Sequence, residues 1–316
     1  MERSNCHICP HNCSLLPGET GKCLVRQNVG GRIIPIYEGE CTLLATEPIE
    51  KRPLFHFLPG EDFLAVGLLG CSLACKFCQT FEISQSVQSE TTHRSPRELI
   101  DLALSKQVSG IAFTFNEPTI HYEYIMEVAN GVKNTDLKIV IKSNGFINKH
   151  ILDDLDMATD AWNIDLKGDH IAYESICSGS IQPVLATVES LIGKGSHLEI
   201  SYLVLPEQID NMQHHTLMRD WLSNLSTSIP IHLIYFYPFY QKQEGRYNPG
   251  QLLVIRDLFA QKLDYVYISN IFNSEIKYYR DTRCSVCDNV LISRQSGARI
   301  QQLDCCGVSL AGIFRK

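Results

Sequence analysis

The sequence predicts an α/β fold, a partial (β/α)6 barrel with a small cysteine-rich segment at each end. From about residue 63 onward, short β-rich runs alternate with helix-period runs, which is typical of βα units with parallel strands. Six or seven such units close only part of a barrel, because full closure takes eight. Polar motifs follow most of the strands, where barrel enzymes gather their reactive groups. We expect three parts: a cysteine-rich segment at 1–45, the barrel at 46–280 and a zinc-ribbon-like tail at 281–316.

The composition argues against several classes of protein. Hydrophobic residues make up 44% and charged residues 20% of the 316 positions, which is globular rather than disordered usage. The net charge of −7 argues against a sequence-independent nucleic-acid clamp. No apolar run approaches the roughly 18 residues of a membrane span, and the opening MERSNCHICP has no signal-peptide core. We therefore expect neither a nucleic-acid nor a membrane partner.

Cysteine usage indicates metal sites. Thirteen cysteines are many for this length. Without an export signal they favour metal binding in a reducing cytoplasm over disulfides. Eleven of them fall into three groups, and Cys41 and Cys177 stand alone.

The first group, Cys6, Cys9, Cys13 and Cys23, has the spacing C-x2-C-x3-C-x9-C. Pro and Gly between these cysteines disfavour a helix or a long strand, so we expect a loop-rich knuckle. Four soft ligands suit tetrahedral zinc and also an iron–sulfur cluster. A metal would supply folding energy that so short a segment cannot draw from a core. Free thiols are the alternative interpretation.

Residues 26–60 are predicted to link this knuckle to the barrel. The run EPIEKRPLFHFLPG, from Glu47 to Gly60, is rich in Pro and favours an extended segment that wraps onto the core. His56 lies between two Phe residues, and we expect a packed histidine with a hydrogen-bond partner.

The barrel itself is predicted from local patterns. The expected strands are 63–70, 110–115, 137–143, 161–166, 197–205, 229–237 and 264–269. The expected helices with helix-period apolar residues are 122–132, 181–192, 211–222 and 252–262. A further helix begins at Ser95, because Ser95, Pro96 and Glu98 form a capping box with Pro at the first helical position.

The second group of cysteines follows the first predicted barrel strand. Cys71, Cys75 and Cys78 have the spacing C-x3-C-x2-C, and no fourth cysteine follows within several residues. Three thiolates can hold three irons of a [4Fe–4S] cluster and leave the fourth iron without a protein ligand. An open metal position suits catalysis, whereas structural sites are closed. The alternatives are a zinc knuckle or redox thiols.

Polar residues after the next strands are candidate ligand contacts. Asn116 and Glu117 in FNEPT can accept hydrogen bonds from a ligand ammonium. Glu117 can equally cap the helix that follows. Ser143 and Asn144 in SNG offer small polar groups in a tight turn that a ligand can approach, and a plain strand-to-helix turn is the alternative.

Three further side chains complete the predicted site. Asp165 and Lys167 lie two apart on one strand, so they point to the same face. Burying either is costly unless it is paired or used, so the alternatives are a ligand site and a structural salt bridge. His232 is a candidate ribose or substrate contact, and its alternative is a core histidine with satisfied hydrogen bonds.

The third group of cysteines closes the chain. Cys284 and Cys287 form a C-x2-C pair, and Cys305 and Cys306 follow after a hairpin-like stretch, which suggests a zinc ribbon. Neighbouring residues rarely turn both side chains to one ion. We therefore take Cys284, Cys287 and Cys306 as candidate zinc ligands, completed by another residue, or else the site is degenerate.

The motifs together resemble one family along nearly the full chain. CHICPHNC, EPIEKRPLFHFLPG, CSLACKFCQTFEISQ, FTFNEPTIHYEY, SNGFIN and NIDLKG are similar to radical S-adenosylmethionine (SAM) proteins of the AmmeMemoRadiSam type, relatives of the pyruvate formate-lyase activating enzyme. The resemblance implies a [4Fe–4S] cluster on Cys71, Cys75 and Cys78 whose open iron binds SAM. It also implies that Lys167 meets the SAM carboxylate, that Asp165 helps to bind SAM or a cation, and that FNEPT meets the SAM amino group.

The resemblance leaves three functions open. The first is an activase that makes a glycyl radical on a partner protein through a 5′-deoxyadenosyl radical. The second is radical modification of a small molecule or of a peptide or protein side chain. The third is a metal-bound adaptor without enzymatic activity. The implied partners are an electron donor such as flavodoxin or ferredoxin, a protein substrate, and a Memo- or AMMECR-type protein, in the cytoplasm.

Overall fold

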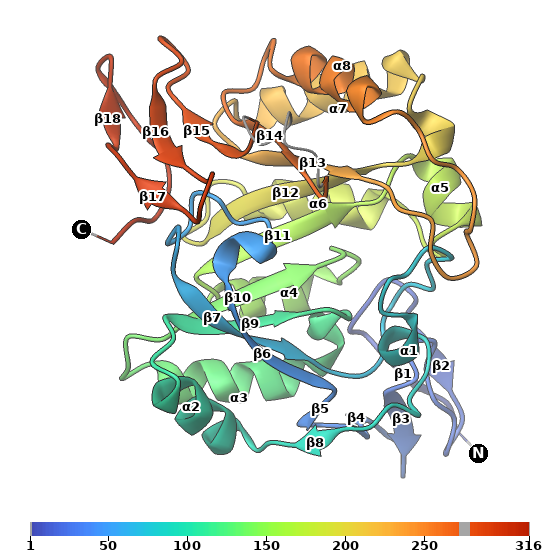
Figure 1. The fold of residues 1–316 in the computed structure, drawn as a ribbon. Helices are drawn as coiled ribbons and strands as arrows, with labels where there is room; N and C mark the ends of the chain where they lie inside the picture. Colours follow the sequence, from blue (N-terminus) through green and yellow to red (C-terminus); the bar gives the residue numbers. More distant parts are fainter. Residues whose placement is uncertain (1, 272–278, 316) are drawn as a thin grey trace.

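An open, mostly parallel sheet forms the centre of the computed structural model, which describes residues 2–271 and 279–315 (Figure 1). Its strands lie in the order β14-β13-β12-β11-β10-β9-β7-β6. Their bounds are β6 Leu43–Pro48, β7 Asp62–Gly67, β9 Gly110–Thr114, β10 Lys138–Ser143, β11 Ala161–Leu166, β12 His197–Val204, β13 Ile231–Tyr235 and β14 Val266–Ser269. Strands β7 to β14 run parallel, and β6 pairs antiparallel with β7. Strands β6 and β14 are the two edges of this sheet, so it is a partial barrel.

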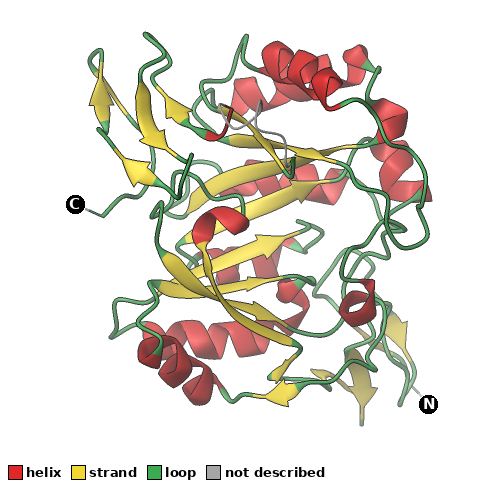
Figure 2. Ribbon diagram, in the orientation of Figure 1, coloured by secondary structure: helices red, strands yellow, loops and turns green. Residues whose placement is uncertain are grey.

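Helices connect the parallel strands and lie around the sheet (Figure 2). The α-helices are α1 Phe81–Ser84, α2 Pro96–Ser105, α3 Tyr122–Val132, α4 Lys149–Asp156, α5 His170–Ser175, α6 Gln182–Leu191, α7 Met212–Leu225 and α8 Pro249–Phe259. Short 3₁₀ turns are η1 Ile49–Lys51, η2 Pro118–His121 and η3 Pro206–Gln208. Each connection between successive parallel strands contains a helix, which confirms the predicted α/β partial barrel.

The predicted elements agree closely with the observed ones. All seven predicted strands are present, shortened by up to three residues at an end. Helix α3 has the predicted bounds, and the capping box of Ser95 and Glu98 opens α2. The interpretation of 26–60 as a linker is wrong in part, because it contains β6 and the hairpin of β3 (Arg26–Val29) with β4 (Arg32–Pro35). Edge strand β6 is partly exposed, so it lacks the continuous apolar run of a central strand.

Small antiparallel pairs flank the barrel. At the N-terminal end β1 (Ser4–Asn5) pairs with β2 (Ser14–Leu15), and β5 (Glu40–Cys41) pairs with β8 (Thr92–His93). The C-terminal strands are β15 Thr282–Arg283, β16 Val290–Ser293, β17 Arg299–Ile300, β18 Asp304–Cys305 and β19 Val308–Ser309. Figure 1 shows these C-terminal strands (red) and the N-terminal strands (dark blue) on opposite sides of the molecule. None of the described helices has the length and apolar character to cross a membrane.

A buried carboxylate fastens the 47–60 segment across the barrel. Glu199 on β12 is fully buried and accepts hydrogen bonds from the backbone N–H groups of Phe55 and His56, at 2.9 and 2.7 Å. The imidazole of His56 is hydrogen-bonded to the carbonyl of Ala311 and to the hydroxyl of Tyr267. The prediction of a packed, partnered His56 is therefore confirmed, and the wrapping segment is held by Glu199, Tyr267 and Ala311.

Candidate functional site

A cavity of about 890 Å³ lies inside the partial barrel. Every parallel strand contributes at or just after its carboxyl end, as the fold predicts. The contributing residues include Cys71, Thr114, Ser143, Asp165, Leu203, Tyr235 and Ser269. The volume falls within the range of roughly 300–1,000 Å³ that is usual for ligand pockets.

The cluster loop, residues 70–79, follows β7 at one end of this cavity. Cys71, Cys75 and Cys78 all line the cavity, and in the described part of the chain no other cysteine does. Gly70 opens the loop with φ +79°, and a Cβ there would lie 2.4 Å from the carbonyl oxygen of Cys23. Glycine is therefore required at this close approach. Three thiols facing one cavity fit a cluster that keeps one iron open to a ligand.

Polar groups surround the three sulfurs. The Leu73 N–H lies 3.4 Å from the Cys71 sulfur, and the Asn144 side-chain amide lies 3.6 Å from it. The Ser84 hydroxyl lies 3.0 Å from the Cys78 sulfur. Such hydrogen bonds tune the ligands of an iron–sulfur cluster.

Burial opposes ionisation of these thiols in the absence of a cation. Burial, followed by the Glu117 carboxylate, raises the pKa of Cys71 well above its usual value. A hydrogen bond with Cys177, followed by burial, does the same to the pKa of Cys75. Cys177 is a fully buried free thiol. The thiolate forms of Cys71 and Cys75 therefore need the positive charge of a bound metal.

Glu117 organises the site but does not line the cavity. Its carboxylate accepts hydrogen bonds from the N–H and hydroxyl of Thr119, the hydroxyl of Ser143 and the N–H of Asn144, at 2.7–3.1 Å. Burial raises the pKa of Glu117 although these bonds oppose the shift. The expected contact of Glu117 with a ligand ammonium is thus corrected. Its carboxylate caps η2 through the N–H of Thr119 and holds the SNG turn through Ser143 and Asn144.

Asn116 does line the cavity, and its amide joins two strand ends. Its side-chain NH₂ donates to the carbonyl oxygens of Leu69 and Gly70, at 3.1 and 2.9 Å, and its oxygen accepts from the N–H of Leu68. These bonds fix the start of the cluster loop against the end of β9.

The SNG turn lies beside the cluster loop, and both Ser143 and Asn144 line the cavity. Asn144 donates to the hydroxyl of Ser72 at 3.1 Å, while its oxygen accepts from the N–H of Phe146 at 2.8 Å. The turn therefore contacts the cluster loop directly and is more than a plain connection between strand and helix.

Asp165 and Lys167 form a triad with Lys142, a residue that the sequence analysis missed. Lys142 donates to one carboxylate oxygen of Asp165 at 2.7 Å, and Lys167 donates to the other at 2.8 Å. Strand register explains the contact, because Lys142 on β10 is opposite Asn163 on β11 and Asp165 is the next residue on that face. The signal available in the sequence was Lys142 itself, a charged residue directly after the apolar run Ile139–Ile141.

The triad carries an excess of positive charge into the cavity. Burial alone would raise the pKa of Asp165, but Lys142 and Lys167 outweigh it and hold this pKa well below its usual range. Burial lowers the pKa of Lys142, whereas Asp165 and Cys75 overcome the effect of burial at Lys167 and raise its pKa. Two ammonium groups thus share one carboxylate, an arrangement that attracts an anionic ligand group.

The rest of the cavity is also rich in cations. Its described lining residues include two carboxylates, Glu50 and Asp165, and six cationic side chains: Lys51, Arg52, Lys142, Lys167, Arg280 and Arg294. Arg52 forms an ion pair with Glu47 and its guanidinium lies 4.4 Å from the centre of the Phe115 ring. The sequence analysis missed Arg52 because only the folded 47–60 segment brings it to the barrel interior.

The expectation that His232 contacts a ribose or a substrate is corrected. His232 is fully buried and does not line the cavity. Its Nε2 lies 2.7 Å from the carboxylate of Glu199, and its ring packs edge-on against Phe55 and stacks on Tyr267. The 47–60 segment therefore covers His232. The structure supports its alternative interpretation as a core histidine, but only in part, because Nε2 is hydrogen-bonded while the buried Nδ1 has no partner among the described residues.

The N-terminal knuckle lies against the cluster loop. His11 donates a hydrogen bond to the carbonyl of Ser72 at 2.8 Å, and the N–H of Asn148 donates to the carbonyl of Ile8 at 3.0 Å. Three of its thiols, those of Cys6, Cys9 and Cys23, are buried. Burial raises the pKa of all three, that of Cys9 to about 12. The knuckle thus supports the cluster loop through direct contacts, whether or not the knuckle holds a metal.

Only the C-terminal thiols converge tightly. Within residues 2–271 and 279–315, they form the one group of three or more potential metal ligands whose ligand atoms all lie within 4.8 Å of one another. The group contains Cys305 in addition to the three expected members Cys284, Cys287 and Cys306. Both neighbouring cysteines, Cys305 and Cys306, belong to this group, although neighbouring residues rarely turn both side chains to one ion.

Comparison with known sequences gives a family match and several relatives. Residues 67–218 match the sequence model of the radical SAM superfamily. An uncharacterized protein of Methanocaldococcus jannaschii is 33% identical over 305 residues, which cover 95% of this chain and 90% of that protein. A putative glycyl-radical enzyme activating enzyme of Haemophilus influenzae is 24% identical over 133 residues, or 40% of this chain and 51% of that protein.

Solved structures share the fold. SuiB of Streptococcus suis, solved bound to precursor peptide SuiA, has a TM-score of 0.53 at 14% identity, covering 71% of this chain and 52% of SuiB. A radical SAM methyltransferase from Sphaerobacter thermophilus has a TM-score of 0.53 at 14% identity, with 70% of each chain covered. The superfamily match spans the cluster loop, FNEPT, SNG and the Asp165–Lys167 pair, which line or brace the cavity described above. This chain belongs to the radical SAM superfamily.

Proposed function

We propose that this chain is a radical SAM enzyme whose [4Fe–4S] cluster is held by Cys71, Cys75 and Cys78. The observation that carries the proposal is that these three thiols and the Lys142–Asp165–Lys167 triad line the same cavity. When bound there, cluster and SAM together supply a 5′-deoxyadenosyl radical that abstracts a hydrogen atom from the substrate. The triad offers its excess positive charge to the SAM carboxylate, with Lys167 as the proposed contact.

The other cavity residues hold this arrangement in place. Asn116 fixes the start of the cluster loop, and Ser143 and Asn144 present the SNG turn to the cofactor side of the cavity. Glu117 acts through them as a positioning residue, since its carboxylate binds Ser143 and Asn144. A polar network whose members are all satisfied is rigid, as a preorganised cofactor site requires.

The test is SAM cleavage by the loaded protein. The chain is reconstituted anaerobically with iron and sulfide, reduced with dithionite and mixed with SAM, and 5′-deoxyadenosine is measured. We expect product from the wild type and none from a triple Cys71→Ala, Cys75→Ala, Cys78→Ala variant. The matched control is Cys41→Ala, because Cys41 is buried and lies outside the cavity. A fully loaded wild type without product would refute the proposal, as would an active triple variant.

For the substrate, we favour a glycine of a partner protein, so that the enzyme is an activase. The Haemophilus influenzae relative described as a putative glycyl-radical enzyme activating enzyme supports this choice. So does the cavity position of Asp165 and Lys167, the pair that resembles the activase motif. A glycyl radical doublet in the electron paramagnetic resonance (EPR) spectrum of a candidate partner, after incubation with SAM and reductant, is the expected result. Deuterium transfer from a small molecule into 5′-deoxyadenosine would contradict it.

A second candidate is modification of a peptide or protein side chain, or of a small molecule. The peptide version has one specific support, that SuiB shares the fold and was solved with precursor peptide SuiA. A mass change on a peptide substrate without a glycyl radical would favour it. The third candidate, a metal-bound adaptor, predicts that no 5′-deoxyadenosine forms at all.

Partners follow from the chemistry. Reduction of the cluster calls for a low-potential donor such as flavodoxin or ferredoxin, and the family resemblance adds a Memo- or AMMECR-type protein as a candidate partner. The division into 1–45, 46–280 and 281–316 stays a prediction, since parts of these segments pack on one another. Limited proteolysis of the loaded protein would test those boundaries.

A further inference from the structure

Four thiols meet at the outer end of the C-terminal ribbon, which we define as residues 281–315. The sulfurs of Cys287 and Cys305 lie 3.5 Å apart, and those of Cys305 and Cys306 lie 3.8 Å apart. The sulfur of Cys284 completes the group, and the four sulfurs all lie within 4.8 Å of one another. A tetrahedral zinc ion with Zn–S bonds of about 2.3 Å sets its sulfurs about 3.8 Å apart. The spacing is that of a four-thiolate metal site.

Two tight turns create this convergence. Cys284 follows β15, and in the turn that leads to β16 its N–H donates to the carbonyl of Asn289 and its carbonyl accepts from the N–H of Asp288. Cys306 and Gly307 join β18 to β19, with φ +53° and +75°. Two central residues with positive φ form a type I′ hairpin turn. Cys305 on the strand and Cys306 in the turn therefore both face the site, although they are neighbours in sequence.

The ribbon has little else to hold its two hairpins together. Strands β15, β16 and β17 form one sheet, and β18 and β19 form another. Their shared core with the barrel is small, namely Phe55, Tyr265, Tyr267, Cys284, Leu291, Ile292 and Leu310. Short segments with so few buried apolar residues usually need a metal or a disulfide to fold stably. The four thiols join the two hairpins at the point where their sheets are separate.

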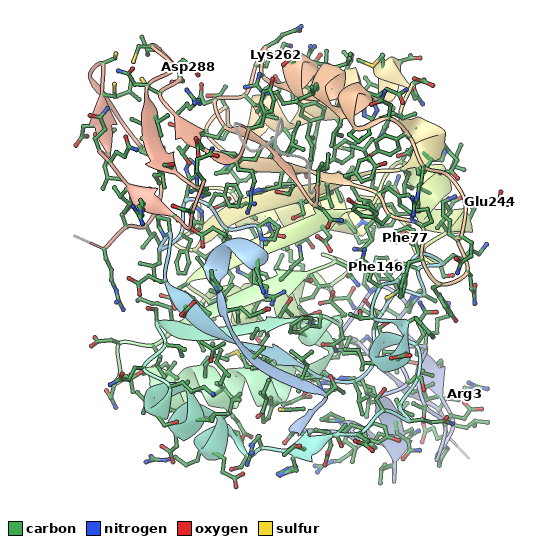
Figure 3. All side chains as sticks on the ribbon, in the orientation of Figure 1. Arg3, Phe77, Phe146, Glu244, Lys262 and Asp288 are labelled. Carbon is green, nitrogen blue, oxygen red and sulfur yellow. The ribbon has the colours of Figure 1, made fainter. Side chains whose placement is uncertain are left out.

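The inner end of the ribbon is a wall of the cavity. Arg294, Gln295, Gly297 and Ala298, in the turn between β16 and β17, line the cavity. Arg294 is buried, donates to the carbonyl of Phe55 at 2.5 Å and lies 4.2 Å from the centre of the Phe55 ring. Figure 3 places Asp288, at the thiol end, far from Phe77 of the cluster loop, and Figure 1 shows β16 and β17 on the left and α1, just after the cluster loop, on the right.

We propose that Cys284, Cys287, Cys305 and Cys306 bind one structural zinc ion, which holds the 294–298 turn in place as the wall of the cavity opposite the cluster loop. Zinc suits a closed four-thiolate site because it has no redox chemistry and accepts tetrahedral geometry. Binding releases the thiol protons, since zinc takes thiolates. The inference is independent of the proposed SAM chemistry, because its test reads zinc content and backbone protection in the ribbon and does not depend on SAM cleavage.

The test measures zinc and backbone protection in the full chain, purified anaerobically with its cluster. We expect about one zinc ion per chain bound to four sulfurs at about 2.3 Å by X-ray absorption. A Cys284→Ser, Cys306→Ser double variant should lose one equivalent of zinc by elemental analysis, whereas Cys41→Ser should keep it. Hydrogen exchange should become faster in 291–303 of the double variant and stay unchanged in α3.

A milder perturbation covers the case in which the double variant fails to fold. Exchange of zinc for Co²⁺ in the wild type should give the thiolate-to-cobalt charge-transfer bands of a tetrahedral site, absent from the single variant Cys306→Ser. Iron at the four sulfurs, a Cys287–Cys305 disulfide in the anaerobic protein, or zinc that stays in every C-terminal variant would overturn the metal assignment. Unchanged exchange in 291–303 after zinc loss would overturn the role as a wall.

Discussion

Replacing Asp165 with Asn is the most direct test of the electrostatics of the site. The carboxylate accepts hydrogen bonds from Lys142 at 2.7 Å and from Lys167 at 2.8 Å. The exposed fraction of the three side chains is 16–25%, and all three line the cavity. Asn keeps the shape and an acceptor oxygen but removes the charge, so two buried ammonium groups lose their counter-ion.

The expected cost follows from this geometry. Removing one partner of a buried ion pair costs about 3–5 kcal/mol, because the remaining charge is buried without compensation. The partial exposure to the cavity favours the lower end, so we expect Asp165→Asn to lower the free energy of unfolding by about 3 kcal/mol. Part of the cost is relieved by deprotonation of Lys142, whose pKa burial already lowers.

The sign of the pH dependence is fixed by the lowered pKa of Asp165. A carboxylate with a depressed folded-state pKa contributes stability above its unfolded pKa of about 3.9 and loses it as the pH falls through the folded value. The difference between wild type and variant should therefore be constant from roughly pH 5 to 8 and shrink below about pH 4.

Anaerobic urea unfolding, followed by the fluorescence of Trp162 and Trp221, measures both effects. The matched control is Asp101→Asn, which removes the carboxylate of an exposed pair with Arg97 and should change stability far less. A loss in Asp165→Asn no larger than in Asp101→Asn would refute the buried triad. So would a difference from the wild type that grows as the pH falls below about 4.

Three further substitutions probe the loop, the buried acid and the ligand charge. Gly70→Ala places a Cβ 2.4 Å from a backbone oxygen at φ +79°, so we expect lower iron retention after reconstitution, and full retention would contradict this close approach. Glu117→Gln should lower the free energy of unfolding by about 2 kcal/mol in urea titrations, because charged acceptors strengthen hydrogen bonds, and an unchanged midpoint would argue against its positioning role. Lys142→Met removes the excess charge and should weaken SAM binding about tenfold in equilibrium dialysis, and unchanged affinity would show that the carboxylate lies elsewhere.

The barrel could be predicted because its information is local. Helix α3 and the capping box before α2 are encoded by apolar spacing and by three neighbouring residues, and both lie where the sequence predicts them. Parallel strands bring their carboxyl ends together, so motifs distant in sequence were expected at one place. The cavity at those ends contains Cys71, Ser143 and Asp165 from three different strands or the loops after them.

The partnership of each site residue could not be predicted, because it depends on register and on segments that fold over the barrel. Glu117 was weighed equally as a ligand contact and as a cap. The contact with Thr119 forms the cap, and the further contacts with Ser143 and Asn144 depend on how β10 lies beside β9. Lys142 was overlooked because a single lysine in a strand is usually solvated, and its contact with Asp165 needs the β10–β11 register. His232 is covered because a segment far earlier in the chain, around Phe55, packs on it.

The third group of cysteines shows where spacing rules fail. A zinc ribbon is usually expected to have one C-x2-C pair in each half. Cys305 and Cys306 are adjacent and therefore do not fit that spacing. A type I′ turn changes the direction of the side chains between the two residues, because Cys306 has φ +53° while Cys305 remains on the strand. The signal was the glycine that follows, since C-C-G before a short apolar run is consistent with a hairpin of this kind.

The two cysteine-rich ends of the chain contact opposite walls of one cavity. This accounts for their presence on a barrel that already has its own cysteines in the cluster loop. An open partial barrel leaves its interior accessible at both ends and along its edges, so its walls depend on what packs there. The N-terminal knuckle holds the cluster loop through His11 and through the close approach of Cys23 to Gly70. The C-terminal ribbon supplies Arg294 at the other side. Loss of order in the knuckle around Cys6–Cys23 or in the ribbon should therefore alter the cavity without unfolding the sheet, since the sheet of β6, β7 and β9 to β14 includes no strand of either.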